Sequence, residues 1–191
     1  MPRIFVALPL PLDVARSLAA AVPEMRALRP VAPELLHVTL AFIGSIEEGR
    51  VADVGSAVSA AVPAVRRFRV GLDTVGRFPP AGAPRVVWAG TGPAAAPIQL
   101  LGARVRAELL HRGVPFDAKP LSAHVTLARV RDPVAADEAR EVAALLRRVR
   151  LPEGLAFDVE AVHVMESALG PYGPRYSSRA RIALPAGDRA G

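Results

Sequence analysis

One tetrapeptide, His-Val-Thr-Leu, occurs twice in this chain of 191 residues, at residues 37–40 and again at residues 124–127. Half of the four histidines and half of the four threonines lie in these two copies. An imidazole titrates near neutral pH and can accept or donate a proton, and a hydroxyl can hydrogen-bond a phosphate oxygen. Two histidines that face each other would suit paired general acid and general base chemistry on a phosphoryl group.

Both copies read as β-strands, in which successive side chains point to opposite faces. The residues expected on the polar face are His37, Thr39 and Ala41 in the first copy and His124, Thr126 and Ala128 in the second. The residues expected on the apolar face, toward the core, are Val38, Leu40 and Phe42 and, in the second copy, Val125, Leu127 and, if a small irregularity follows Ala128, Val130. A single motif of this kind is better explained by strand residues that face solvent, but two copies with the same polarity favour a functional site.

Other kinds of catalytic site have little support. The chain has no cysteine, which excludes disulfides, thiolate metal sites and a cysteine nucleophile. No acidic residue lies beside either motif histidine on its strand, and there is neither a glycine-rich phosphate loop nor a serine nucleophile elbow. We therefore expect no metal and no cofactor. The other two histidines read as ordinary residues, His111 at the end of a helix, where a cation is favoured, and His163 in a strand.

The composition is that of a globular protein, with 51% hydrophobic residues and a mean hydropathy of +0.29. No stretch reaches the roughly 20 apolar residues of a membrane span. Pro9, Pro11 and Asp13 interrupt the apolar N-terminal segment, so a buried first strand is expected rather than a signal peptide. We expect a cytoplasmic protein. The net charge is +6, and all 24 basic residues except Lys119 are arginines, which suits a phosphate-bearing partner but also fits codon bias.

The order of predicted elements starts again near the middle of the chain. Strands are expected at 3–8, 36–43, 68–78, 85–89, 123–130, 157–165 and 175–184, and helices at 12–28, 47–62, 96–111 and 134–149. Each motif strand is followed by a helix, by a strand that opens with Phe68 or Phe157, and by a turn. This order predicts an internal duplication, with repeats at about 36–90 and 123–184. The expected fold class is α+β with antiparallel or mixed sheets, as one domain of residues 1–185 with two lobes around a cleft and a frayed tail at 186–191.

These motifs resemble the two-histidine (2H) phosphoesterase superfamily, whose signature is a pair of H-x-[ST]-x motifs. More narrowly, the chain is similar to the bacterial and archaeal RNA 2′,3′-cyclic phosphodiesterases, also called the LigT-like or 2′-5′ RNA ligase family. The segments that carry the similarity are residues 3–9, 36–44, 75–79, 85–90, 124–129 and 165–167, together with Tyr176. Two departures, the lack of a tryptophan before the first motif and Ala123 in place of a proline, concern the cleft rim and therefore substrate preference.

The resemblance implies two pseudo-symmetric α+β lobes, made of duplicated β-α-β units with antiparallel sheets, and the motifs on facing strands. It implies metal-independent hydrolysis of a terminal 2′,3′-cyclic phosphate on RNA to a 2′-phosphomonoester. His124 would be the proton acceptor that activates water, His37 would be the proton donor to the leaving 3′ oxygen, and Thr39 and Thr126 would hold the nonbridging oxygens. The partners would be RNA ends with a cyclic phosphate, tRNA fragments among them, and we expect a monomer. The alternatives are 2′-5′ RNA ligation or cleavage of a small cyclic nucleotide in the same site, and a non-catalytic module that binds RNA ends.

Five further residues are candidates for substrate contact. Phe42, Phe78 and Trp88 could form an aromatic platform for the terminal base, although core packing is the expected role of Phe42 and Trp88. Arg129 could counter phosphate charge, but strand alternation places it on the face opposite His124 unless the strand twists or bulges there. Tyr176 could line the rim of the cleft.

Overall fold

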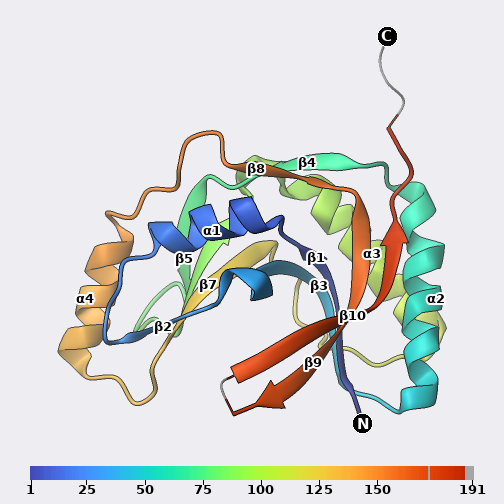
Figure 1. Ribbon diagram of the computed structural model, residues 1–191, viewed down its shortest axis with the longest axis horizontal. Helices are drawn as coiled ribbons and strands as arrows, with labels where there is room; N and C mark the ends of the chain where they lie inside the picture. The colour runs from blue at the N-terminus through green and yellow to red at the C-terminus, as the bar shows by residue number, and fades with distance from the viewer. Residues whose placement is uncertain (172, 188–191) are drawn as a thin grey trace.

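The structure is a computed structural model that describes residues 1–171 and 173–187, without the side chains of residues 93 and 94 (Figure 1). The strands are β1 (Arg3–Pro9), β2 (Leu28–Pro30), β3 (His37–Ser45), β4 (Phe68–Gly71), β5 (Thr74–Phe78), β6 (Val86–Gly90), β7 (His124–Val130), β8 (Ala156–Val159), β9 (Ala161–Gly170) and β10 (Gly173–Ala183). The α-helices are α1 (Leu12–Ala21), α2 (Val51–Ala61), α3 (Ala96–His111) and α4 (Ala136–Leu146). Short 3-10 helices are η1 (Pro33–Leu35), η2 (Glu48–Arg50), η3 (Val62–Ala64) and η4 (Gly92–Ala95). In the described part of the chain, no helix has the length and apolar character needed to cross a membrane.

One antiparallel sheet carries both motif strands. Its order is β10-β9-β1-β3-β7-β6-β5, with β2 also paired to β7. The two halves of this sheet meet between β3 and β7, where a single residue pair, Val38 with Val125, joins the strands. A second sheet consists of β4 and β8, again antiparallel. The expected α+β fold with antiparallel sheets is confirmed.

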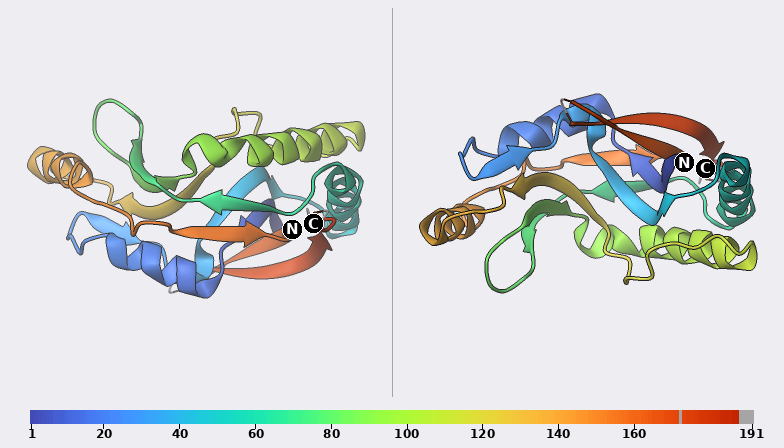
Figure 2. Two further views of the ribbon diagram at one scale, coloured as in Figure 1. Left: turned by 90° about the horizontal axis from the view of Figure 1, so that it is seen from above. Right: turned by 90° about the horizontal axis from the view of Figure 1, so that it is seen from below.

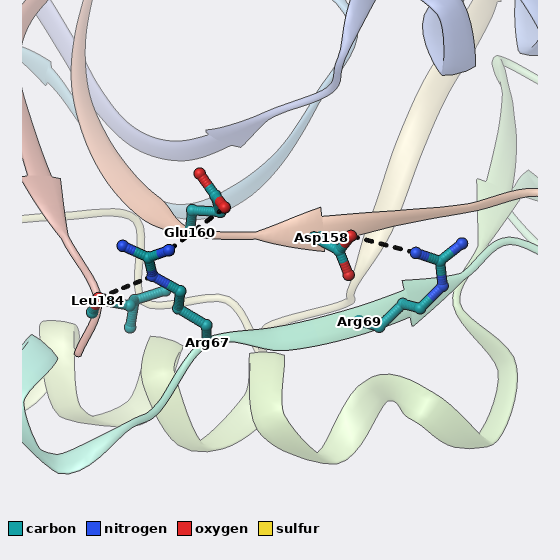
Figure 3. Close-up of polar contacts among 5 residues, drawn as sticks. All are labelled: Arg67, Arg69, Asp158, Glu160 and Leu184. Atoms are coloured by element: carbon teal, nitrogen blue, oxygen red, sulfur yellow. Dashed lines mark hydrogen bonds and ion pairs between the residues drawn. The ribbon is translucent and has the colours of Figure 1, made fainter. Parts of the chain in front are cut away.

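Equivalent residues of the two expected repeats face each other at two places. Val38 pairs with Val125, and each follows the histidine of its own motif. Arg69 pairs with Asp158, and each follows the phenylalanine that opens its strand. An ion pair of 3.1 Å joins Arg69 Nη1 to Asp158 Oδ2 across this second pair (Figure 3). A twofold axis that relates the repeats would therefore pass through both pairs. The limits of the repeats stay a prediction.

The helices lie outside the large sheet and at its ends. α2 and α3 pack against each other, with α3 against β3 and α2 against β9 and β10 (Figures 1 and 2). α4 lies at the end of the molecule opposite α2, where it contacts β5 (Figure 1). Alternate residues of the strands and one side of each long helix form the core, in which Val6, Leu40, Val54 and Leu101 are fully buried.

Several element boundaries differ from the sequence-based expectations. The helix expected at 12–28 ends at Ala21, because Val22 takes an extended conformation immediately before Pro23. The strand expected at 68–78 is divided between β4 and β5, which belong to different sheets, and the strand expected at 157–165 is divided in the same way between β8 and β9. Alternation of apolar residues continues through such a change of sheet and does not reveal it. Residues 186–187 of the expected tail have no regular secondary structure, and residues 188–191 lie outside the described residues.

Candidate active site

The two motif histidines lie on one face of the large sheet, which we call the histidine face. Val38 and Val125 are both 0% exposed, so the residue pair that joins β3 to β7 points into the core. The residues on either side of each valine point the other way. These are His37 and Thr39 in β3 and His124 and Thr126 in β7, all of which are half-buried.

A β-bulge follows each motif threonine and changes which side chains reach the histidine face. In β3 the register with β1 skips Leu40, and in β7 the register with β6 skips Leu127. An extra residue shifts the alternation of the strand beyond it. Ala41 and Ala128, both 0% exposed, therefore turn into the core. The expectation that these alanines share the face of the histidines is wrong for this reason.

Phe42 is brought out of the core by the bulge in β3. It pairs with Phe5 of β1, which contacts the His37 ring, so the Phe42 ring lies on the histidine face. It is 39% exposed, and the Arg3 guanidinium lies over the ring at 5.6 Å from its centre. The expected core position of Phe42 is wrong, because its ring is partly exposed on the histidine face.

Arg129 reaches the histidine face through the equivalent bulge in β7. Its backbone pairs with Val86 of β6 beyond the skipped residue Leu127. The strand therefore has the bulge that Arg129 needs in order to lie on the same face as His124. Its positive charge contributes to lowering the pKa of both His37 and His124, because a cation nearby disfavours the imidazolium form. Arg129 therefore lies where it can attract a phosphate.

Each histidine is held by the backbone carbonyl two residues before it. His37 Nδ1 lies 2.7 Å from Leu35 O, and His124 Nδ1 lies 2.8 Å from Ser122 O. A carbonyl oxygen can only accept, so Nδ1 carries the proton in both rings and donates it. In the neutral rings Nε2 is then the basic atom, which can take a proton from water or, once protonated, give it to a leaving oxygen.

Burial is the main influence on both imidazoles. It lowers the pKa of His37 and of His124, because the charged ring would lose its water. The hydrogen bond to Leu35 or Ser122 raises the pKa in each case, but by less. The charge of His124 also lowers the pKa of His37, so the two rings are within electrostatic reach of each other.

On the His37 side, Phe5 and Tyr176 pack against the imidazole. Their ring centres are 4.9 Å and 5.4 Å from that of His37. Burial raises the pKa of Tyr176, so its hydroxyl is neutral and can donate a hydrogen bond. The sequence points to Tyr176 but not to Phe5, because nothing sets Phe5 apart from the other apolar residues of the first strand.

On the His124 side, Phe78 and Trp88 take the equivalent place, with ring centres 5.0 Å and 6.3 Å from that of His124. The Trp88 indole covers two strand glycines. A Cβ at Gly76 would come within 2.2 Å of the indole, and a Cβ at Gly90 within 2.8 Å. Trp88 is therefore half-buried against the sheet rather than part of the core that was expected for it. An isolated glycine in a strand marks a close approach of this kind and could have pointed to the pair.

Leu40 and Leu127 are the extra residues of the two bulges. The backbone carbonyl of each accepts a hydrogen bond from a residue that belongs to neither of the two strands paired at that bulge. Arg106 of α3 donates from Nε to Leu40 O at 2.9 Å and from Nη1 to Lys119 O at 2.7 Å. The backbone N–H of Val31 donates to Leu127 O at 2.9 Å. Arg106 thus ties the bulge in β3 to the segment that leads into β7, a role that its sequence context does not indicate.

His163 is half-buried on β9, with its Nδ1 3.1 Å from Ser178 Oγ, in keeping with a structural or surface role. Within residues 1–171 and 173–187, no three His, Cys, Asp or Glu side chains are grouped as a metal site would need.

Known proteins share this sequence pattern and fold. The model of the 2′-5′ RNA ligase superfamily matches residues 14–171. An RNA 2′,3′-cyclic phosphodiesterase of Thermus thermophilus is 32% identical over 193 residues, which cover 95% of this chain and 90% of that protein. A protein of the same name from Archaeoglobus fulgidus is 29% identical, over 91% of this chain and 96% of its own length.

Solved structures place the chain in the same fold. A crystal structure of a Thermus thermophilus protein has a TM-score of 0.77 and 28% sequence identity, and the match covers 96% of this chain and 98% of that chain. E. coli LigT in its apo form has a TM-score of 0.76 with 23% identity, over 96% of this chain and 98% of its own. The likeness therefore extends over almost the whole of each chain.

Proposed function

We propose that this chain, which belongs to the 2′-5′ RNA ligase superfamily, hydrolyses a 2′,3′-cyclic phosphate at an RNA end to a 2′-phosphomonoester. The observation that carries the proposal is the pair of equivalent histidines on one face, each bonded through Nδ1 to a carbonyl and free to transfer a proton at Nε2. Relatives named RNA 2′,3′-cyclic phosphodiesterase support the substrate class.

In the proposed reaction, His124 takes a proton from water as the water oxygen attacks phosphorus, and His37 gives a proton to the ribose 3′ oxygen as the P–O3′ bond breaks. In-line displacement requires the attacking and leaving oxygens on opposite sides of phosphorus, and two rings on either side of the β3–β7 junction suit that requirement. Exchange with solvent then returns both rings to their starting forms. The assignment of acid and base to the individual histidines follows the family resemblance.

Three further side chains would stabilise the charge that builds up on the phosphoryl oxygens. The hydroxyls of Thr39 and Thr126 lie on the face of the histidines and can donate to nonbridging oxygens. Arg129 adds a positive charge that both imidazoles sense. Aromatic rings around the site offer stacking surfaces to the terminal base, namely Phe42, Phe78, Trp88 and Tyr176.

The likeness of the two histidine sites favours a second candidate reaction, 2′-5′ RNA ligation. Each imidazole has a carbonyl partner and two flanking rings, so acid and base can exchange roles. In ligation a 5′ hydroxyl would attack phosphorus in place of water, the P–O3′ bond would break, and a 2′-5′ phosphodiester would form; the reverse reaction would release the 5′ hydroxyl.

The decisive experiment is the incubation of RNA that ends in a 2′,3′-cyclic phosphate with the protein in EDTA. The position of the product phosphate is read by mass spectrometry, with a cyclic mononucleotide run in parallel. We expect a 2′-phosphate, and we expect His37→Ala and His124→Ala each to lower kcat by about 10²- to 10⁴-fold. His111→Ala, at the exposed end of α3, is the control and should keep the wild-type rate.

Two results would contradict the proposal. Wild-type turnover by the double variant His37→Ala/His124→Ala would show that the histidines do not carry the reaction. Tight binding of the RNA end without any product would instead favour a non-catalytic binding module.

A further inference from the structure

A pocket lies between residues 73–75, at the start of the edge strand β5, and residues 146–151, at the C-terminal end of α4. Figure 1 shows β5 and α4 at the same end of the molecule. The volume of the pocket is about 410 Å³. The residues that line it are Asp73, Thr74 and Val75 on the β5 side and Leu146, Arg147, Val149, Arg150 and Leu151 on the α4 side. None of these residues takes part in the proposed reaction.

The α4 side of this pocket is strongly basic. Arg147 and Arg150 line the pocket, and Arg148 lies outside it, next to Arg147 in the chain. All three are exposed, and none of them forms an ion pair with an acidic group of the described residues. Arg150 donates from Nη1 to the carbonyls of Arg147 and Val149 at 2.8 Å and 3.0 Å, which satisfies the end of α4. The acidic group that faces these cations across the pocket is Asp73.

Thr74 connects the pocket with the proposed active site. It pairs with Gly90 of β6, and Gly90 pairs with His124 of β7. Paired residues of antiparallel strands point to the same side, so Thr74 lies on the histidine face. Two strand spacings, about 10 Å, separate it from His124. The Trp88 indole, which covers Gly90, lies along this path.

We propose that Arg147, Arg148 and Arg150 bind the sugar–phosphate backbone of the single-stranded RNA whose cyclic phosphate end occupies the histidine site. This inference rests on the proposed function. The path of about 10 Å from His124 to Thr74 corresponds to about three stacked nucleotides at roughly 3.4 Å each, and the arginines lie on the other side of the pocket from Thr74, so they receive a phosphate at least three nucleotides from the reacting end. A guanidinium group binds phosphate through paired N–H donors.

The β5 side of the pocket suits a ribose. The Thr74 hydroxyl and the Asp73 carboxylate offer a donor and acceptors to a 2′ hydroxyl, the group that distinguishes RNA from DNA. Trp88 offers an aromatic face over which a base can stack between the two sites. The charge, the hydroxyl and the aromatic ring together define a path for one RNA strand from the histidine face to the end of α4.

The test compares substrates of one, two, four and eight nucleotides that end in a 2′,3′-cyclic phosphate, each at several salt concentrations. The variant is Arg147→Gln/Arg148→Gln, which leaves Arg150 in place because its bonds close α4. The control is Arg16→Gln/Arg104→Gln, which removes the same charge from exposed positions on α1 and α3. Each lost phosphate contact lowers the slope of log kcat/KM against log salt by about 0.7 for single strands.

We expect the variant to lower this slope by about 1.4 for the eight-nucleotide substrate, for two lost contacts, and to leave the mononucleotide unchanged. If the variant keeps the wild-type slope, or if the control changes the slope by the same amount, the inference is overturned. Hydrolysis by the wild type would still support the proposed function in that case. If the wild type hydrolyses no cyclic phosphate, fluorescence anisotropy of a bound eight-nucleotide RNA decides instead. Equal affinity and equal salt dependence for variant and wild type would then overturn the inference as well.

Discussion

Replacement of Gly76 by alanine should displace the Trp88 ring from its place on the histidine face. A Cβ at Gly76 would stand 2.2 Å from Trp88 Cζ2, 2.4 Å from Cη2 and 2.6 Å from Cε2, whereas ordinary contacts begin at 3.4 Å. The indole must therefore retreat by about 1.2 Å, the difference between 3.4 Å and 2.2 Å. Overpacking of this kind costs about 1 to 3 kcal/mol of folding free energy.

The same displacement should reduce activity. The ring would leave its place beside Phe78 and His124, where it can stack on a base. Stacking on an aromatic side chain contributes about 1 to 3 kcal/mol per base, so we expect kcat/KM for RNA to fall by about 5- to 150-fold. Trp88 is the only tryptophan of the chain, so its fluorescence emission reports the position of this ring alone.

The matched control is Gly71→Ala at the end of β4, where an added Cβ would meet no atom within 4 Å. It should change neither the emission nor kcat/KM. If Gly76→Ala keeps the wild-type emission maximum, unfolding midpoint and kcat/KM, then the indole does not rest on Gly76. If the emission changes and kcat/KM does not, Trp88 takes no part in substrate binding.

Three other predictions follow from the site. Burial and the Arg129 charge lower the pKa of both histidines from 6.5, so the plot of kcat/KM against pH should peak below pH 6.5. The rising limb would report the loss of a proton from the base, His124, and the falling limb the loss of a proton from the acid, His37. A peak above about pH 7 would contradict this. Arg129→Gln removes a charge that disfavours imidazolium, so both limbs of the pH profile should move to higher pH, and unmoved limbs would show that this charge is not felt. Arg106→Met removes two charge-assisted hydrogen bonds and should lower the free energy of unfolding, measured in urea, by about 2 to 4 kcal/mol. This is less than the summed contributions of two such bonds, because the Arg106 side chain is half exposed. Arg104→Met, on the same helix but exposed and without such bonds, should stay within about 0.5 kcal/mol of the wild type, and equal losses in the two variants would count against a specific role of Arg106.

Short-range features of this protein could be predicted from the sequence because they depend on neighbouring residues. The alternation of His37, Val38 and Thr39 follows from the two-residue period of any strand, and the buried valine confirms it. The class of fold followed from the order of helical and strand-like segments. The limits of the repeats and the roles of the two histidines stay predictions.

Long-range features could not be predicted, because they depend on contacts between distant parts of the chain. The carbonyl of Leu40 is held by Arg106, 66 residues away, and Tyr176 reaches His37 from the far edge strand β10. Nothing near Phe68 indicates that the chain changes sheets after four residues of strand.

The sequence by itself determined which residue types are available for the proposed chemistry, since the repeated tetrapeptide specifies two imidazoles and two hydroxyls with the same polarity on a strand. Only the tertiary structure decided which other side chains share their face. The bulges at Leu40 and Leu127 turn Ala41 and Ala128 inward and bring Phe42 and Arg129 outward. A bulge is set by the pairing of neighbouring strands and by the donors that take up the bulged carbonyl, and these partners come from elsewhere in the chain.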